Sequence, residues 1–140
     1  MPDLGRVLGL DLGDARIGVA ISDDQQRVAV PFGTIRTGAP EDLKAIAQLV
    51  ADNDVSEVVV GHPLKMSGDA GPRADKAAGF ADVLRSVLSV PVSLQDERLS
   101  TVEAERALKT AGATGRDRKR VVDQAAATVI LQSALDLRLG

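Results

Sequence analysis

The 140-residue chain contains no cysteine, no tryptophan and no tyrosine, and its only histidine is His62. Without cysteine the chain cannot form a disulfide, so a reducing compartment is permitted. A structural zinc site lacks its usual ligands, because these are thiolates and imidazoles. Any bound metal must therefore be held by oxygen atoms, which favours Mg²⁺ or Mn²⁺.

Aromatic side chains are almost absent, since only Phe32 and Phe80 occur. Stacking platforms for unpaired bases are therefore missing, and a nucleic acid would be recognised through its phosphates and shape. The net charge of −3 argues against a constitutive polyanion binder, although a local basic patch can still bind nucleic acid. No apolar run approaches the roughly 18 residues of a transmembrane span, and the first residues lack the pattern of a signal peptide.

The length and the hydrophobic content of 44% predict one globular domain over residues 1–140. Helical spacing is found over residues 43–50, 77–88, 100–111 and 119–137, with a loop over 62–71. Short apolar segments predict strands over residues 7–11, 17–22, part of 26–35, 57–61 and 90–95. Short turns join the first three as antiparallel hairpins, and Pro31 indicates an edge or a bulge. The pattern predicts an α/β fold: a mixed five-stranded sheet, three antiparallel strands then two parallel, with helices on both faces.

Asp11 is the most informative residue, because it closes an apolar run and precedes the turn residue Gly13. A carboxylate at that place costs stability unless a cation lies opposite it, and a metal ion is the simplest partner. Taken alone, an aspartate before a glycine is more often a turn residue. Two further acids, Glu97 and Asp123, occur where they could complete a metal site.

Four segments resemble, in order, the motifs of the YqgF family, which is related to Holliday junction resolvases. They are Asp11-Leu12-Gly13 with Arg16-Ile17-Gly18-Val19-Ala20, then Val59-Val60-Gly61-His62-Pro63-Leu64, then Asp96-Glu97-Arg98-Leu99-Ser100-Thr101, and Asp123 with Ala125-Ala126-Ala127 and Ile130-Leu131-Gln132. The resemblance implies a ribonuclease-H-like fold and a cytoplasmic location. Members are regarded as candidate nucleases, linked to 5′-end maturation of precursor 16S ribosomal RNA or to cleavage of four-way DNA junctions. Position 62, commonly Leu in this family, is His62 here.

The resemblance implies that Asp11, Glu97 and Asp123 are the catalytic residues and hold Mg²⁺ or Mn²⁺. Two such ions can activate water, stabilise the leaving oxygen and neutralise the phosphate. Asp96 and Glu97 are adjacent, so in an extended segment only one can face the site, and we favour Glu97. Asp123 could instead be a solvated helix residue.

Basic residues near these acids are candidate phosphate ligands: Arg16, His62, Lys65, Arg98, Arg116, Arg118, Lys119 and Arg120. The last four precede Asp123 at a predicted helix start, where cations oppose the helix dipole. That placement favours phosphate binding over a merely solvated surface. Arg16 and Arg98 could instead pair with neighbouring carboxylates. His62 could act on a proton or contact phosphate, although a surface histidine without such a role is commoner.

We therefore predict a divalent-metal-dependent endonuclease acting on structured nucleic acid, either precursor rRNA or branched DNA. One alternative is a non-catalytic ribosome- or nucleic-acid-binding factor, against which the complete acid set argues. Another is half of an actin-like ATPase or phosphotransferase, whose first phosphate motif Asp11-Leu12-Gly13 also resembles. A homodimer presenting two sites would suit a two-fold junction. The choice between RNA and DNA depends on local geometry that the sequence does not supply.

Overall fold

The computed structural model describes residues 4–63, 71–96 and 115–139, and in the last range it describes the side chains of residues 124–137. Strands and helices follow one another as β1 (Arg6–Leu12), β2 (Arg16–Ser22), β3 (Ala29–Arg36), α1 (Glu41–Asp52), β4 (Val55–His62), α2 (Pro72–Val87), β5 (Val92–Asp96) and α4 (Gly115–Leu139). The helix that we predict over residues 100–111 lies outside the described residues. Within the described ranges, no helix has both the length and the apolar character that crossing a bilayer requires.

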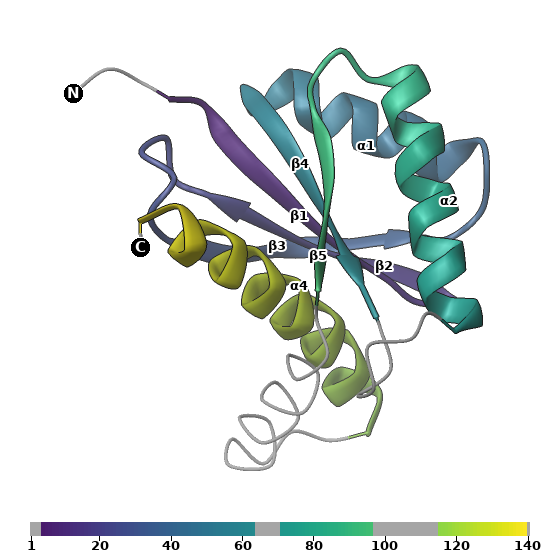
Figure 1. Ribbon diagram of the computed structural model, residues 1–140. Helices are drawn as coiled ribbons and strands as arrows, with labels where there is room; N and C mark the ends of the chain where they lie inside the picture. The colour runs from purple at the N-terminus through teal and green to yellow at the C-terminus, as the bar shows by residue number, and fades with distance from the viewer. Residues whose placement is uncertain (1–3, 64–70, 97–114, 140) are drawn as a thin grey trace.

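The five strands form one sheet in the order β3-β2-β1-β4-β5 (Figure 1). β1 pairs with β2, and β2 with β3, in antiparallel fashion, whereas β1–β4 and β4–β5 are parallel. The predicted mixed five-stranded sheet is thus confirmed. β3 is an edge strand, and its register shifts where Val19 pairs with Gly33 but Ala20 pairs with Pro31. Pro31 therefore lies at both an edge and a bulge, where its missing N–H is tolerated.

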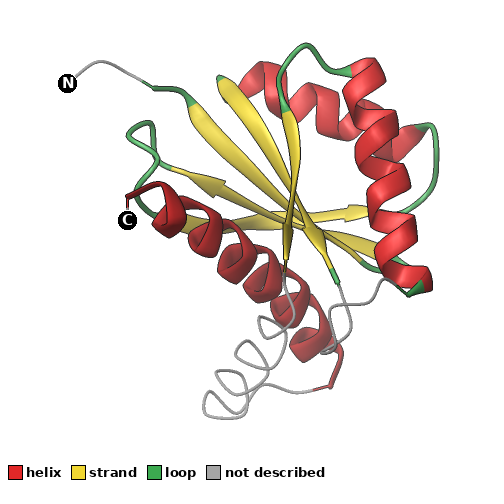
Figure 2. Cartoon of the chain, in the orientation of Figure 1, coloured by secondary structure: helices red, strands yellow, loops and turns green. Residues whose placement is uncertain are grey.

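Helices cover both faces of the sheet, as Figure 2 shows, which also confirms the prediction. On one face α1 and α2 pack over a core that includes Leu8 and Leu10 of β1. On the other face α4 packs over a core that includes Val7 of β1 and Leu131 of the helix. Successive side chains of a strand point to opposite faces. The even-numbered residues of β1 therefore face α1 and α2, and the odd-numbered residues face α4.

The direction of α4 is opposite to that of β1. Near its C-terminal end, the Gln132 side chain accepts from the Ala29 N–H at 2.9 Å and donates to the Arg27 carbonyl at 3.0 Å. Ala29 starts β3, beside the end of β2 and hence beside the beginning of β1. Near the start of the helix, Gln124 instead lies with Arg16, where β2 begins. The beginning of α4 and the C-terminal ends of β4 and β5 thus share one end of the molecule (Figure 1).

Most boundaries differ from those predicted by one to a few residues, and two of the differences bear on the site. His62 is not in a loop but is the last residue of β4, where it pairs with Asp96 of β5. Pairing with β5 keeps the backbone extended through His62, so the loop begins at Pro63, one residue later than predicted. The last helix begins at Gly115 rather than at Lys119. The charged residues between Gly115 and Lys119 are compatible with a helix, so the helix begins one turn earlier than predicted.

Candidate functional site

Asp11 lies at the C-terminal end of the central strand and is partly buried. It pairs with Gly18 of β2. As an odd-numbered residue of β1, it shares the α4-covered face with Val7 and Gly9. The Asp11 carboxylate is thus partly buried at a strand end and faces the start of α4. At this place it is well positioned to share a metal ion with an acidic side chain of that helix.

The turn that follows Asp11 is fixed by backbone contacts. The Gly13 N–H donates to the Arg16 carbonyl at 2.9 Å, and a Cβ atom on Gly13 would lie only 2.6 Å from that oxygen. The Thr37 hydroxyl donates to the Gly13 carbonyl at 3.2 Å, and the Thr37 N–H donates to the Ala15 carbonyl at 3.0 Å. The segment after β3 is therefore hydrogen-bonded to the hairpin that carries Asp11 and stabilises its conformation.

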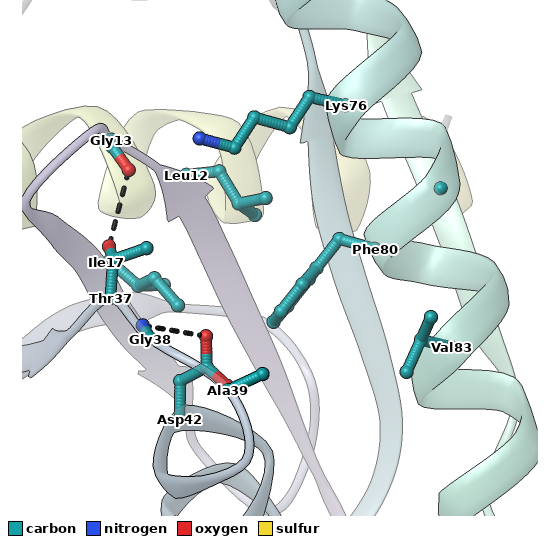
Figure 3. Close-up of a pocket in the computed structure, with 11 residues that line it drawn as sticks. Leu12, Gly13, Ile17, Thr37, Gly38, Ala39, Asp42, Lys76, Phe80 and Val83 are labelled. Carbon is teal, nitrogen blue, oxygen red and sulfur yellow. Dashed lines mark hydrogen bonds between the residues drawn. The ribbon is translucent and has the colours of Figure 1, made fainter.

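Asp42, near the start of α1, fixes the position of this segment after β3. Its side chain is buried, with 4% exposed, and one oxygen accepts the Gly38 N–H at 3.1 Å (Figure 3). The other oxygen accepts the Leu43 N–H at 2.7 Å. Both carboxylate oxygens are thus hydrogen-bonded, which offsets the cost of burying the charge. Asp42 was not a predicted site residue, and its role is structural.

The backbone of α4 at Asp123 lies toward the end of the sheet where Asp11 is found. Gly9 of β1 meets Ala127 and Leu131 of α4, because a Cβ atom on Gly9 would lie 3.3 Å from the Ala127 carbonyl and 2.8 Å from the Leu131 Cβ. Asp123 is one helical turn before Ala127, a step of roughly 6 Å. Asp11 is two strand residues beyond Gly9, a step of roughly 6.7 Å. Since the helix and the strand run in opposite directions, both steps lead to the same end of the sheet.

Asp96, the last residue of β5, lies on the face of the sheet away from Asp11. Val92 and Leu94 pack in the core under α1 and α2, so Asp96 shares their face and not that of Asp11. His62, its register partner, also lies on that face, because Val58 and Val60 do. The structure therefore does not bring His62 and Asp96 together with Asp11. Asp96 is therefore not on the face of Asp11, and the choice of Glu97 as ligand stays a prediction.

Several predicted site residues cannot be compared with the structure. Lys65, Glu97 and Arg98 lie outside the described residues. For Arg116, Arg118, Lys119, Arg120 and Asp123 the structure describes the backbone of α4 only. Among the described residues, no three or more His, Cys, Asp or Glu side chains form a group that could hold a metal ion. The metal site of three acids thus stays a prediction.

Arg16 does lie near Asp11, and it has a neighbour that the sequence analysis missed. Arg16 is the register partner of Arg36 on β3. Both line a pocket of about 630 Å³, the arginine pocket, whose walls are Ala15, Arg16, Gly33, Thr34, Arg36 and Gln124. The register of the β2–β3 hairpin pairs the two arginines, but this register shifts at the bulge near Pro31. The sequence alone does not reveal that shift.

The opposite face of the sheet carries a mainly apolar pocket of about 290 Å³ (Figure 3). Leu12, Phe80 and Val83 contribute its apolar walls. Lys76 also lines it, and its ammonium group lies 3.9 Å from the exposed Asp14 carboxylate. The buried polar groups here are already bonded, and the pocket lies on the face away from Asp11. It belongs to the scaffold that supports the hairpin.

The architecture matches that of solved Holliday junction resolvases. Thermus thermophilus RuvC, in a complex with a Holliday junction substrate, matches with a TM-score of 0.57 at 18% identity, over 96% of each chain. The yeast mitochondrial Holliday junction resolvase matches with a TM-score of 0.53 at 13% identity, over 99% of this chain and 81% of the other. At such identities the likeness shows the fold. The fold and the position of Asp11 together define a RuvC-like, ribonuclease-H-like domain.

Sequence comparison identifies the family. The family model described as RuvX, Holliday junction resolvase, matches residues 5–137. A protein of Anaeromyxobacter dehalogenans is 50% identical over 134 residues, which is 95% of this chain and 98% of the relative. One of Chloroflexus aggregans is 49% identical over 133 residues, which is 94% of each chain. Both relatives are named as candidate pre-16S rRNA nucleases. The chain belongs to the RuvX (YqgF) family of resolvase-like nucleases, which confirms the resemblance of its four motifs.

Proposed function

We propose that this protein is a metal-dependent endonuclease that hydrolyses phosphodiester bonds in structured nucleic acid, with precursor 16S rRNA as its substrate. The position of Asp11 carries the proposal: an acid at the end of the central strand, on the face shared by α4 and the arginine pocket. The names of relatives about 50% identical support the RNA substrate. The resolvase fold makes a four-way DNA junction the alternative substrate.

We propose Asp11, Glu97 and Asp123 as ligands of Mg²⁺ or Mn²⁺. Carboxylate oxygens are the ligands that these hard cations prefer. The helical step to Asp123 supports the choice of that residue, since it leads toward the end of the sheet where Asp11 lies. When bound, such ions activate water and neutralise charge at the phosphate. Backbone contacts hold the Gly13 turn that follows Asp11. Asp11 therefore loses little backbone conformational entropy when it binds a metal ion.

Substrate phosphates are the proposed partners of the basic side chains. Arg16 contributes from the arginine pocket, on the same face as Asp11. The run Arg116, Arg118, Lys119 and Arg120 belongs to the first two turns of α4, which precede Asp123. Roles for Lys65, Arg98 and His62, a second protomer and the cytoplasmic location stay predictions.

The test is the substitution Asp11→Asn, which keeps the shape and removes the charge. Loss of a metal ligand removes several kcal/mol of transition-state stabilisation, so we expect cleavage to fall roughly a thousandfold. Cleavage of a precursor 16S rRNA fragment and of a four-way DNA junction is measured with Mg²⁺ and Mn²⁺. Asp14→Asn is the control, because it removes the same charge from an exposed residue of the same hairpin.

Thermal unfolding of both variants shows whether the fold is kept. Cleavage that survives in Asp11→Asn, after repurification to exclude a contaminating nuclease, would end the proposal. Binding without cleavage by the wild type under any divalent cation would favour the non-catalytic alternative. The ratio of rates on the two substrates decides between RNA and DNA.

A further inference from the structure

We infer that the arginine pocket binds a phosphate that flanks the scissile bond, with Arg36 and Arg16 as paired ligands. The inference rests on the proposed function for the identity of the ligand, the phosphodiester backbone of a nucleic acid. It adds a substrate-positioning site beside the proposed metal ligands, with Arg36 as a residue that no motif indicates.

The pairing of the two arginines points to an anion. Arg16 and Arg36 are direct register partners on antiparallel strands, so their side chains leave from the same face. Like charges at such positions are destabilising unless something compensates them. Arg36 is exposed, and no ion pair joins it to any residue that the structure describes. A phosphate bound between the two guanidinium groups would interact favourably with both.

The other side chains of the pocket suit the same ligand. Thr34 contributes a hydroxyl from β3, and Gln124 contributes an amide from α4. Both groups can donate hydrogen bonds, and guanidinium groups bind phosphate oxygens in a bidentate manner. Among the side chains that the structure describes, no acidic group and no aromatic ring lines the pocket. The pocket can therefore hold a phosphate, but it has no platform on which to read a base.

The register places this pocket beside the proposed active site but not in it. Asp11, Gly18 and Thr34 form one row across β1, β2 and β3, and Arg16 and Arg36 form the next row on that face. Strand spacing of roughly 4.8 Å and a rise of roughly 3.4 Å per residue put the Asp11 and Arg36 Cα atoms roughly 12 Å apart. With roughly 3.4 Å per nucleotide along one strand of a duplex, this distance corresponds to roughly three to four nucleotides. We therefore assign the bound phosphate to a position that flanks the scissile one.

Binding is tested with Arg36→Gln in the Asp11→Asn background and with EDTA in place of divalent cations, so that the nucleic acid stays intact. Fluorescence anisotropy measures the affinity for RNA and DNA of equal length at a series of KCl concentrations. We expect roughly three- to tenfold weaker binding, and a slope of log K against log salt that is shallower by roughly 0.7–0.9. The same loss with RNA and DNA would show that the shared phosphodiester is the ligand.

Arg27→Gln is the matched control. Arg27 is also an exposed arginine, but it precedes β3 at the opposite end from Arg36. Both substitutions change the net charge equally. The inference requires Arg36→Gln to have the larger effect, and equal effects of the two variants would overturn it.

Cleavage kinetics separate a flanking contact from a catalytic one. In the active protein we expect Arg36→Gln to raise KM roughly three- to tenfold and to leave kcat unchanged. A substrate shortened to one nucleotide on either side of the scissile bond should not respond to Arg36→Gln. A fall in kcat with no change in KM would overturn the inference.

Gln124→Glu provides a second variant of nearly the same shape, and it introduces a negative charge into the pocket. We expect it to weaken binding at least as much as Arg36→Gln, because it repels the phosphate. Unchanged affinity in Gln124→Glu would contradict the inference. These results are independent of the cleavage test: if Asp11→Asn kept full cleavage while Arg36→Gln lost affinity, the proposed catalytic site would fail and the phosphate site would stand.

Discussion

At Gly9, the absence of a side chain determines how closely a helix approaches the central strand. The nearest atoms that a Cβ would meet are the Leu131 Cβ at 2.8 Å and the Ala127 carbonyl oxygen at 3.3 Å. Both belong to α4, and one is backbone, so the helix would have to move to make room. Because Asp123 is on the same helix, any such movement also changes its distance from Asp11. Gly9 therefore links packing to the proposed chemistry.

We expect Gly9→Ala to destabilise the protein by about 1–3 kcal/mol, the usual cost of overpacking a core. We also expect reduced cleavage, because α4 is displaced from β1. Urea unfolding measures the first effect and the rRNA cleavage assay the second. Gly33→Ala is the control for stability, since a Cβ there meets nothing within 4 Å. Its free energy of unfolding should change by less than about 0.5 kcal/mol. Equal losses in both variants would contradict this account of Gly9.

Among the connecting elements, the β2–β3 turn is organised by Asp23. The Asp23 carboxylate accepts the Arg27 N–H at 2.8 Å and the Val28 N–H at 3.0 Å. These hydrogen bonds, from Val28 and then Arg27, lower the pKa of Asp23 below its ordinary value of 3.8. The turn leads directly to Ala29, which Gln132 of α4 binds. The charge on Asp23 thus supports the docking of the far end of α4.

This lowered pKa predicts an acid-sensitive contribution to stability. Because the folded pKa lies below the unfolded value, the contribution is complete above about pH 5 and is lost as the pH falls through the folded pKa. We expect Asp23→Asn to be less stable than the wild type at neutral pH, with the difference shrinking as the pH falls below about 5. Denaturant unfolding across this range measures it. Asp24→Asn is the control, because no described residue donates a hydrogen bond to the Asp24 carboxylate. A difference that stays constant with pH would rule out the carboxylate as its source.

The same elements show what local sequence can predict. Apolar periodicity located the strands and helices, and Pro31 indicated the edge and the bulge, because these are local properties. The face of each residue near a strand end was harder. His62 looked like a loop residue near the site, yet pairing with β5 keeps it in β4 on the face away from Asp11. Pairing between distant segments, which no local pattern encodes, made that difference.

At the scale of the whole molecule, the proposed site depends on contacts between distant segments. Asp11 and Arg16 were predictable because they lie in one motif of β1 and β2. Arg36 and Gln124 were not, because they reach Arg16 only through the register of β3 and the docking of α4. Gly9 was part of the first strand, but its role depends on a helix more than 100 residues away. Motifs therefore identified the chemistry, and the fold identified the surface around it.

The charge of the whole chain provides a test of metal binding that does not depend on cleavage. A chain of net charge −3 attracts divalent cations weakly at many places, so a specific site must be separated from this background. A ligand at 100 times its Kd stabilises the folded state by about 2.7 kcal/mol. For a domain of this size, we expect saturating Mg²⁺ or Mn²⁺ to raise the Tm by roughly 5–10 °C. Differential scanning fluorimetry measures this shift, and EDTA should reverse it.

Asp11→Asn and Asp14→Asn have equal net charge, so they attract background cations equally. We expect Asp14→Asn to keep the metal-induced Tm shift and Asp11→Asn to lose most of it, because only Asp11 belongs to the proposed ligand set. Added KCl should abolish the background binding and leave the specific shift in the wild type, since screening acts mainly on exposed charges. If both variants kept the same shift, the cations would bind elsewhere, and the ligand set of Asp11, Glu97 and Asp123 would be wrong.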